Sequence, residues 1–336
     1  MKFASTSDLH FSAYSQDRIM SSGLSNRLHY LNETVRNDIL KYCIENGIDK
    51  IVIAGDVYHN KSIIYSIAQS VFLDIVRDHR NITFIIIPGN HDMSLKSGEG
   101  VSALKSLDNE INVEMIHEPK VIDNILFTPW NAKTMIDTIK NGEAEYLVAH
   151  LGLNEAQLAS GISIVSDIGV KDLSHYKGVI LGHYHSPQEI ISGDTKVYYT
   201  GSPIQMDFGE RGEEKRFLVV DTDSHDIVSI PTQSYKKYYA LELTKENSKE
   251  VIREALNLRE NGHFVRLDKI ENVDTSKIED KIRVVSKLDI DITDRGINAT
   301  MSDEDKLKAY IEIKDVPKED RELYINMGKE IMSKCI

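Results

Sequence analysis

The sequence predicts an α/β fold. Short apolar runs alternate with amphipathic helical patterns through the first two-thirds of the chain, which is typical of a layered sheet flanked by helices. The chain has 336 residues and is 41% hydrophobic, which suits a globular protein with a sizeable core. At roughly 100–200 residues per domain, this length predicts two domains, or one large domain with an appendage.

The alternation begins with buried strands that are separated by helices. Strands are expected at Lys2–Ser5, Lys50–Ala54, Thr83–Pro88, Tyr146–Ala149 and Gly178–Leu181. Between the first three strands, Leu24–Asn46 and Ile63–Asp78 carry apolar residues at helical spacing. Gly47 is a suitable stop for the first of these helices. Strands and helices in this order predict one layered α/β sheet.

The pattern changes after Gln188. Consecutive strands separated by turns are expected at Glu189–Ile191, Val197–Thr200, Phe217–Asp221 and Ile227–Ile230. These strands suggest a second sheet that packs on the first. Beyond Pro231, a strand, a helix and two strands are expected at Tyr238–Thr244, Lys249–Leu258, Phe264–Asp268 and Lys281–Val285. The last four elements would form a small α+β unit.

The last part of the chain is expected to be helical. Asp289–Thr300 is polar and is interpreted as a linker, and two helical patterns follow around a turn at Asp315–Lys318. Their apolar faces carry Leu307, Tyr310, Ile311 and Ile313 in the first helix and Leu323, Tyr324, Met327 and Ile331 in the second. Two helices cannot bury both faces by themselves, so we expect them to pack on a partner or on the preceding α+β unit.

Charge and cysteine content limit the function classes. With 53 acidic and 40 basic residues, the formal net charge is −13, so the chain is not a general nucleic-acid coat. If it handles DNA, metals or a local basic strip must offset this charge. Cys43 and Cys335 do not form a disulfide scaffold and fit a reducing compartment. Neither a membrane span nor a signal peptide is recognisable, so we expect a cytoplasmic location.

Asp, Asn and His side chains follow five of the expected strands. The segments are Asp8-Leu9-His10, Gly55-Asp56-Val57-Tyr58-His59, Gly89-Asn90-His91-Asp92, His150 and Gly182-His183-Tyr184-His185. Loops beyond the carboxyl ends of strands converge in an open α/β sheet, so we expect these side chains to meet. The segments hold six of the twelve histidines, and the other six are interpreted as surface or structural residues.

These residue types predict a pair of metal ions. Oxygen and imidazole donors without thiolates favour Mn, Fe or Zn over a structural thiolate site. Two metals about 3.5–4 Å apart need a bridging carboxylate, and such pairs cleave phosphoesters. Asp56 is the expected bridge. Asp8 and His10 would lie on one side of an extended backbone and bind one metal, while His183 and His185 could divide between the two.

The set of segments resembles the calcineurin-type metallophosphoesterase superfamily. Within it, Gly201-Ser202-Pro203 followed by Phe208-Gly209-Glu210 is similar to the Gly-Ser-Pro…Phe-x-Glu signature of the SbcD nuclease family. That family comprises bacterial SbcD, the archaeal and eukaryotic Mre nuclease and tailed-phage recombination nuclease subunits. Lys281–Lys287 and the helical tail resemble the phage versions most. The resemblance implies a four-layer αββα sandwich, a small α+β capping domain and a C-terminal helical tail.

The resemblance also implies domain boundaries and partners. The nuclease domain would span residues 1–231, the DNA-binding capping domain 232–290, the linker 291–300 and the tail 301–336. The tail would bind an SMC-like coiled-coil ATPase of the SbcC/Rad type. Relatives dimerise through helices near the active site, so Leu24–Asn46 or Ile63–Asp78 could form a homodimer here.

Individual roles follow from the resemblance as well. One metal would be held by Asp8, His10 and His185 and the other by Asn90, His150 and His183, with Asp56 bridging. His91 and His59 would be catalytic, although many relatives carry Asp at the second position. The ions would be two divalent metals, with Mn²⁺ expected and Mg²⁺, Fe²⁺ or Zn²⁺ as alternatives. Arg18, Lys61 and Lys96 lie in nearby loops, where they could contact DNA phosphates or simply be solvated.

The implied activity is that of a metal-dependent DNA nuclease. It would be an exonuclease on duplex ends and an endonuclease on single strands, acting in DNA end processing, recombination, replication and repair. A phage-encoded protein would work in the host cytoplasm, away from membranes. Two alternatives stay open: a phosphoesterase of the same superfamily that acts on phosphoproteins or cyclic nucleotides, and a non-catalytic scaffold. The complete set of ligand-type residues disfavours the scaffold.

Overall fold

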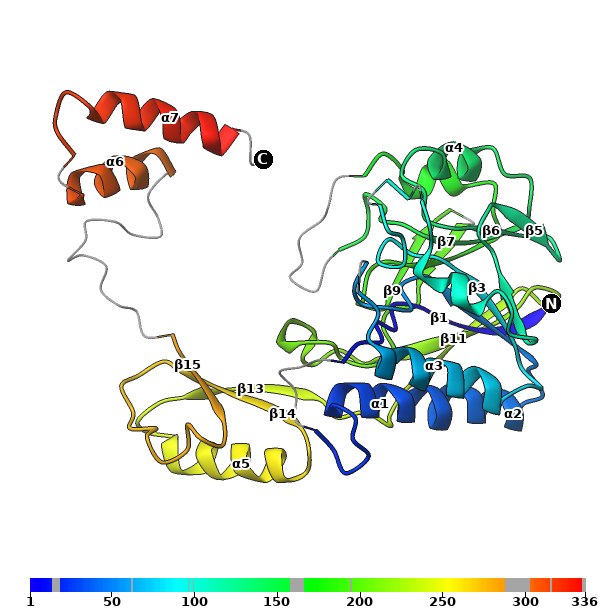
Figure 1. Ribbon diagram of the computed structural model, residues 1–336, viewed down its shortest axis with the longest axis horizontal. Helices are drawn as coiled ribbons and strands as arrows, with labels where there is room; N and C mark the ends of the chain where they lie inside the picture. The colour runs from blue at the N-terminus through cyan, green and yellow to red at the C-terminus, as the bar shows by residue number, and fades with distance from the viewer. Residues whose placement is uncertain are drawn as a thin grey trace. The chain divides into compact units, whose positions relative to one another are not determined.

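The chain forms two compact units in a computed structural model. The structure describes residues 1–13, 19–61, 63–95, 97–98, 100–157, 166–193, 195–287, 303–314 and 316–333. The first unit comprises Met1–Ala240 and Leu258–Phe264, and the second comprises Leu241–Asn257 and Val265–Ile336. Figure 1 shows the helices and strands of both units.

The first unit contains two six-stranded sheets, each with a parallel centre. The first sheet has the order β12-β11-β1-β2-β3-β4, in which β1 to β4 are parallel and β11 and β12 are antiparallel additions. Its strands are β1 (Lys2–Thr6), β2 (Lys50–Ala54), β3 (Thr83–Ile87), β4 (Val113–Met115), β11 (Arg216–Asp221) and β12 (Asp226–Pro231).

The second sheet has the order β5-β6-β7-β8-β10-β9. Its inner strands β6, β7, β8 and β10 are parallel, and the edge strands β5 and β9 are antiparallel to their neighbours. The strands are β5 (Lys120–Ile122), β6 (Ile125–Thr128), β7 (Tyr146–His150), β8 (Gly178–Gly182), β9 (Gln188–Ser192) and β10 (Thr195–Tyr199).

The α/β class with mixed sheets is confirmed, but the predicted division between the sheets is wrong. The sequence placed Tyr146–Ala149 and Gly178–Leu181 with the first three strands, whereas β7 and β8 lie in the second sheet. Conversely, β11 returns to the first sheet, where Val220 pairs with Phe3. Such pairing joins residues far apart in the sequence, so the local apolar pattern does not reveal it. The pattern also missed β4, β5 and β6.

Helices cover the outer face of each sheet. On the first sheet they are α1 (Asn26–Thr34), the π-helical η1 (Val35–Leu40), α2 (Lys41–Glu45) and α3 (Ser66–Asp78). The first three form one continuous run that corresponds to the predicted helix Leu24–Asn46, and α3 corresponds to the predicted helix Ile63–Asp78. Leu28 and Phe72 belong to the apolar cluster that includes Ile51 and Ile53 of β2. On the second sheet, Ile139 of α4 (Met135–Lys140) clusters with β7 and β8 residues.

A third apolar cluster lies between the two sheets. Val52 of β2, next to Ile51 and Ile53 in the sequence, belongs to this cluster together with Val148 and Ile180 of the second sheet. Successive side chains of a strand point to opposite faces, so β2 packs against helices on one face and against the other sheet on the other. The layers are therefore helices, sheet, sheet and helix.

A smaller sheet and three helices complete the described chain. The sheet has the order β13-β14-β15, and its strands are β13 (Tyr238–Leu243), β14 (Phe264–Lys269) and β15 (Arg283–Ser286), with α5 at Ser248–Glu260. The predicted terminal helices are present as α6 (Asp303–Ile313) and α7 (Arg321–Ser333). The predicted linker, Asp289–Thr300, lies outside the described residues. Among the described helices, we find none with the length and apolar content needed to cross a membrane.

Candidate metal centre

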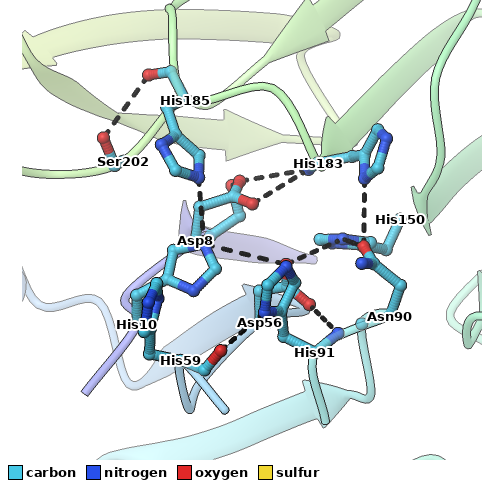
Figure 2. A network of polar contacts seen from close by, with 12 residues as sticks. Asp8, His10, Asp56, His59, Asn90, His91, His150, His183, His185 and Ser202 are labelled. Carbon is cyan, nitrogen blue, oxygen red and sulfur yellow. Dashed lines mark hydrogen bonds and ion pairs between the residues drawn. The ribbon is translucent and has the colours of Figure 1, made fainter. Parts of the chain in front are cut away.

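The predicted ligands gather where strands of both sheets end. Asp8 and His10 follow β1, Asp56 follows β2 and Asn90 follows β3, all in the first sheet. From the second sheet, His150 is the last residue of β7, and His183 and His185 follow β8. Figure 2 shows that these side chains point toward a common region. The structure therefore brings together all seven residues that the sequence assigned to metal binding.

The turns after these strands have left-handed backbone. The φ angles are 52° at Asp8, 51° at His10, 56° at Asp56 and 104° at His183. This conformation is uncommon for residues other than glycine and concentrates at functional sites. The expected extended backbone at Asp8 and His10 is therefore wrong. The amide groups of these two residues donate to the carbonyls of Gly55 and Asp56, and these bonds hold the turn in place.

Glycines let the turns approach one another closely. A Cβ on Gly89 would collide with the Asp56 side chain, and a Cβ on Gly182 would collide with the carbonyl oxygen of Ala54. Asp92, next to Asn90 and His91, accepts hydrogen bonds from the amides of Gly89, Val57 and Tyr58 at 2.9–3.2 Å. This buried carboxylate joins the loops after β2 and β3.

Asp8, His10 and His185 form one group of donors. Their ligand atoms lie within 4.8 Å of one another, and the Nε2 atoms of His10 and His185 are 2.9 Å apart. Both Asp8 carboxylate oxygens accept from the His183 backbone N–H, at 3.2 and 3.1 Å. The His183 backbone therefore orients the Asp8 carboxylate within this group of donors.

Asn90, His150 and His183 form a second group. His150 Nε2 and His183 Nδ1 each lie 3.0 Å from the Asn90 side-chain oxygen. His150 Nδ1 donates to the Ala54 carbonyl at 2.8 Å, because a carbonyl can only accept. That bond fixes the orientation of the ring, so that Nε2 faces the Asn90 side-chain oxygen.

Asp56 lies between the two groups. Its Oδ2 atom is 3.7 Å from His10 Nε2 in the first group and 3.4 Å from His150 Nε2 in the second. Its other oxygen, Oδ1, accepts from the His91 backbone N–H at 2.8 Å. A single carboxylate oxygen that faces one imidazole of each group occupies the position expected of a bridge.

His91 and His59 lie at the edge of the site. Their rings stack at 22° with centroids 5.8 Å apart, and the His10 ring contacts both edge-on. His91 Nδ1 donates to the carbonyl of His59 at 2.6 Å. Ligand atoms of His10, His59 and His91 also lie within 4.8 Å of one another. The two histidines are therefore close enough to act on a group bound by the first donor set.

Burial governs the ionisation of the donors. It lowers the pKa of His10 well below the usual value and, together with His150, lowers that of His183 to about 3. Burial alone would raise the Asp56 pKa, but the charge and hydrogen bond of His150 hold it below its usual range. Burial alone would lower the His150 pKa, but the charge and hydrogen bond of Asp56 raise it to about 9, so metal binding at this imidazole releases a proton.

The donor set fits divalent metal ions. Asp8 and Asp56 are both buried, with relative exposures of 0 and 2%, and they face mainly imidazoles. Two carboxylates buried together need positive charge, which bound cations provide. Oxygen and imidazole ligands suit Mn²⁺, Fe²⁺ or Zn²⁺.

The sequence did not assign a role to Glu210 or Lys215. Glu210 accepts from His185 Nδ1 at 2.8 Å, and Lys215 Nζ lies 2.7 Å from the second Glu210 oxygen. Lys215 also donates to the His185 carbonyl at 2.9 Å. The Gly-Ser-Pro…Phe-x-Glu segment was the available signal, because its last residue is this Glu.

The structure describes one of the three predicted DNA-contact residues. Lys61 lies in the loop that follows β2, two residues beyond His59. Arg18 and Lys96 lie outside the described residues. Their contacts with DNA stay predictions.

A comparison with known protein families assigns the chain to one of them. Residues 1–214 match the family model of calcineurin-like phosphoesterases, and this stretch contains every donor described above. The chain belongs to this family. The matched stretch thus contains the cluster of donors at the strand ends, and it stops just before β11 of the first sheet.

Several individual proteins are similar to this phosphoesterase. The SbcD subunit of the nuclease SbcCD from Staphylococcus epidermidis is 22% identical over 263 residues, which cover 67% of this chain and 69% of that protein. A solved archaeal phosphodiesterase is 16% identical, with a TM-score of 0.35, covering 69% of this chain and 99% of its own. The Pseudomonas putida nuclease MPE is 13% identical, with a TM-score of 0.32, covering 68% and 87% respectively.

Proposed function

We propose that this chain is a metal-dependent DNA nuclease that cleaves phosphodiester bonds. The observation that carries the proposal is the contact between Glu210 and His185. Glu210 ends the segment that resembles the SbcD signature, and it holds a predicted metal ligand at 2.8 Å. A residue of the SbcD-like segment thus supports a predicted metal ligand, and this contact favours a nuclease over a phosphoprotein or cyclic-nucleotide phosphoesterase.

The chain's own residues would divide the work at this site. Asp8, His10 and His185 would hold one ion, Asn90, His150 and His183 the other, and Asp56 both. Ions bound there would supply positive charge for the phosphate and activation of water. The protein orients its donors through fixed bonds, such as His150 to the Ala54 carbonyl. Such partners raise metal affinity by keeping each imidazole in one tautomer.

His91 would handle a proton at the leaving oxygen or stabilise charge on the phosphoryl group. Its Nδ1 hydrogen is engaged by the His59 carbonyl, so Nε2 is the atom that can exchange a proton. His59 stacks on His91 and would support exonuclease action. This bond gives the His91 ring a fixed orientation.

The parts of the chain beyond the nuclease domain would bind DNA and a partner protein. Residues 1–231 would be the nuclease domain, 232–290 the DNA-binding cap, 291–300 a linker and 301–336 the docking element for an SMC-like coiled-coil ATPase. In the terminal helices, Tyr310, Leu323, Tyr324 and Met327 are each at least half exposed, which suits a docking face. The protein would act in the cytoplasm on DNA ends during recombination, replication and repair.

A homodimer would form through the helices that cover the first sheet. Ile63, Tyr65 and Ile67, at and before the start of α3, expose 61, 40 and 43% of their surface. Clustered exposed apolar residues mark interaction sites more often than single ones do. Sedimentation of Ile67→Glu against the unaltered chain would test this interface, with a shift to monomers expected.

A substrate comparison tests the proposed activity. The purified chain is incubated with Mn²⁺ and linear duplex DNA, single-stranded DNA, a phosphopeptide, a cyclic nucleotide or an aryl phosphodiester. We expect cleavage of both DNA forms. Asp56→Asn serves as the control for contaminating nucleases and should be inactive. Turnover of the phosphopeptide or cyclic nucleotide without DNA cleavage would favour the alternative phosphoesterase, and no turnover of any substrate would favour a scaffold.

A further inference from the structure

A cavity of about 280 Å³ adjoins the metal site in the first unit. It borders His183, and its other walls include Trp130, Met135, Ile136, Leu151, Ile168 and Tyr184. Ligand pockets are mostly apolar with a few polar groups, and their volumes usually run from about 300 to 1,000 Å³. The cavity falls just below this range and has room for one flat ring system.

Trp130 presents an aromatic face beside the metal donors. Its ring is parallel to the His183 ring within 16°, with centroids 6.0 Å apart, and it meets the His150 ring edge-on at 6.5 Å. Its backbone N–H donates to the Pro88 carbonyl at 2.9 Å, at the start of the loop that carries Asn90. This bond ties the Trp130 backbone to that loop, while the indole remains partly exposed.

We propose that Trp130 and this cavity form a nucleobase subsite next to the scissile phosphate. The inference rests on the proposed nuclease function, because the base belongs to a substrate held at the metal donors. A base that stacks on the indole would be positioned while its phosphate lies at His183 and His150. Stacking needs only a π face, so the subsite accepts any of the four bases.

Trp130 is also the only tryptophan in the sequence, so tryptophan fluorescence reports on the surroundings of this one ring. The full chain with Mg²⁺ is titrated with deoxyadenosine 5′-monophosphate and, separately, with 2-deoxyribose 5-phosphate, which lacks the base. We expect saturable quenching by the nucleotide and at least about fivefold weaker binding of the sugar phosphate. Equal affinity for the two compounds would overturn the proposal.

Kinetics of two variants separate stacking from a structural role. The substrates are a single-stranded oligonucleotide and the same oligonucleotide with an abasic residue at the cleavage position. We expect Trp130→Ala to raise KM for the first roughly 5- to 100-fold, with little change in kcat. Trp130→Phe, which keeps a flat ring, should stay near the unaltered chain. The abasic substrate should not distinguish the three proteins.

Two kinetic outcomes would contradict the subsite. One is that Trp130→Ala matches the unaltered chain on both substrates. The other is that it loses kcat equally on both, which would indicate a structural wall. The proposed function fails differently: if nucleotide binds better than sugar phosphate but DNA is not cleaved, the subsite stands and the nuclease activity does not. If DNA is cleaved but the nucleotide and the sugar phosphate bind equally well, the nuclease activity stands and the subsite does not.

Discussion

Glu210 fixes the orientation of His185. The Glu210 carboxylate accepts from His185 Nδ1 at 2.8 Å, which turns Nε2 of the same ring toward His10 Nε2. The carboxylate is itself held by the Met206 amide at 2.9 Å and by Lys215 at 2.7 Å. Burial alone would raise the Glu210 pKa, but the hydrogen bond from His185 and the charge of Lys215 lower it to about 2, so the carboxylate stays ionised at neutral pH.

We therefore expect Glu210→Gln to weaken Mn²⁺ binding by about 10- to 100-fold, the usual effect of losing such a supporting partner. Calorimetric titration with Mn²⁺ measures this change. Glu213→Gln is the matched control, because Glu213 contacts Lys215 at 2.7 Å and Ser186 rather than the His185 ring. Equal Mn²⁺ affinity of Glu210→Gln and the unaltered chain would remove Glu210 from this positioning role.

Asp8→Asn should separate stability from metal binding. Burial raises the Asp8 pKa, although His150 and His185 counteract it, so the metal-free fold is more stable with this carboxyl uncharged. The stabilisation from the uncharged Asp8 carboxyl is complete below the pKa that Asp8 has in the unfolded chain. It is lost as the pH rises through the higher pKa that Asp8 has in the folded chain. At pH 7 the amide should leave the metal-free Tm unchanged or higher, while it abolishes Mn²⁺-dependent cleavage.

Thermal unfolding with and without Mn²⁺ checks this expectation. The unaltered chain should gain Tm on addition of Mn²⁺, because a ligand that binds only the folded state stabilises it. Asp8→Asn should gain much less. A lower metal-free Tm together with a full Mn²⁺ response would show that Asp8 is structural and not a ligand.

His91→Ala should keep both metal ions and lose most cleavage. Its ring bonds to the His59 carbonyl, and its backbone N–H holds Asp56, a contact that alanine retains. Loss of a positioned proton donor costs typically 10²- to 10⁴-fold in rate. Metal analysis and single-turnover cleavage measure the two properties separately. An empty metal site in this variant would move His91 into the ligand set.

Deleting residues after Thr300 should remove partner binding and leave chemistry intact. The two terminal helices, α6 and α7, lie outside the stretch that carries the donors. We expect unchanged metal-dependent cleavage of single-stranded DNA, with loss of co-purification with the ATPase and of any stimulation by ATP. A truncated chain that binds the ATPase with full affinity would contradict the docking assignment.

Cys43 should react slowly with thiol reagents. It lies in α2, is fully buried in the apolar cluster beneath the first sheet, and this burial raises the pKa of its thiol to about 12. The thiol is thus neutral at pH 8, where the smaller thiolate fraction alone slows reaction about a thousandfold. Labelling of a Cys335→Ser variant, in which Cys43 is the only cysteine, measures this rate. A labelling rate as high as that of the chain unfolded in guanidinium would contradict the burial of Cys43.

Local patterns in the sequence were enough to find the donors. Asp8, Asp56 and Asn90 each follow an apolar run short enough to be a buried strand, and the turn residues beside them mark where each strand ends. Residue type then specifies the chemistry, because carboxylate, amide and imidazole donors in such numbers suit metal ions. Both properties are local and do not depend on how the sheets assemble.

The packing of the two sheets decided the partners and the geometry of these donors. That His150 and His183 come from a different sheet than Asp8, and that Glu210 contacts His185, depends on strand pairing and on packing between distant segments. The left-handed turn at Asp8 and His10 is likewise held by carbonyls of the next strand's loop, at Gly55 and Asp56. The sequence by itself thus determined which residues supply the candidate donors, whereas only the tertiary structure decided their partners and geometry. The physical reason is that donor type is a property of single residues, while these contacts form only after both sheets have packed.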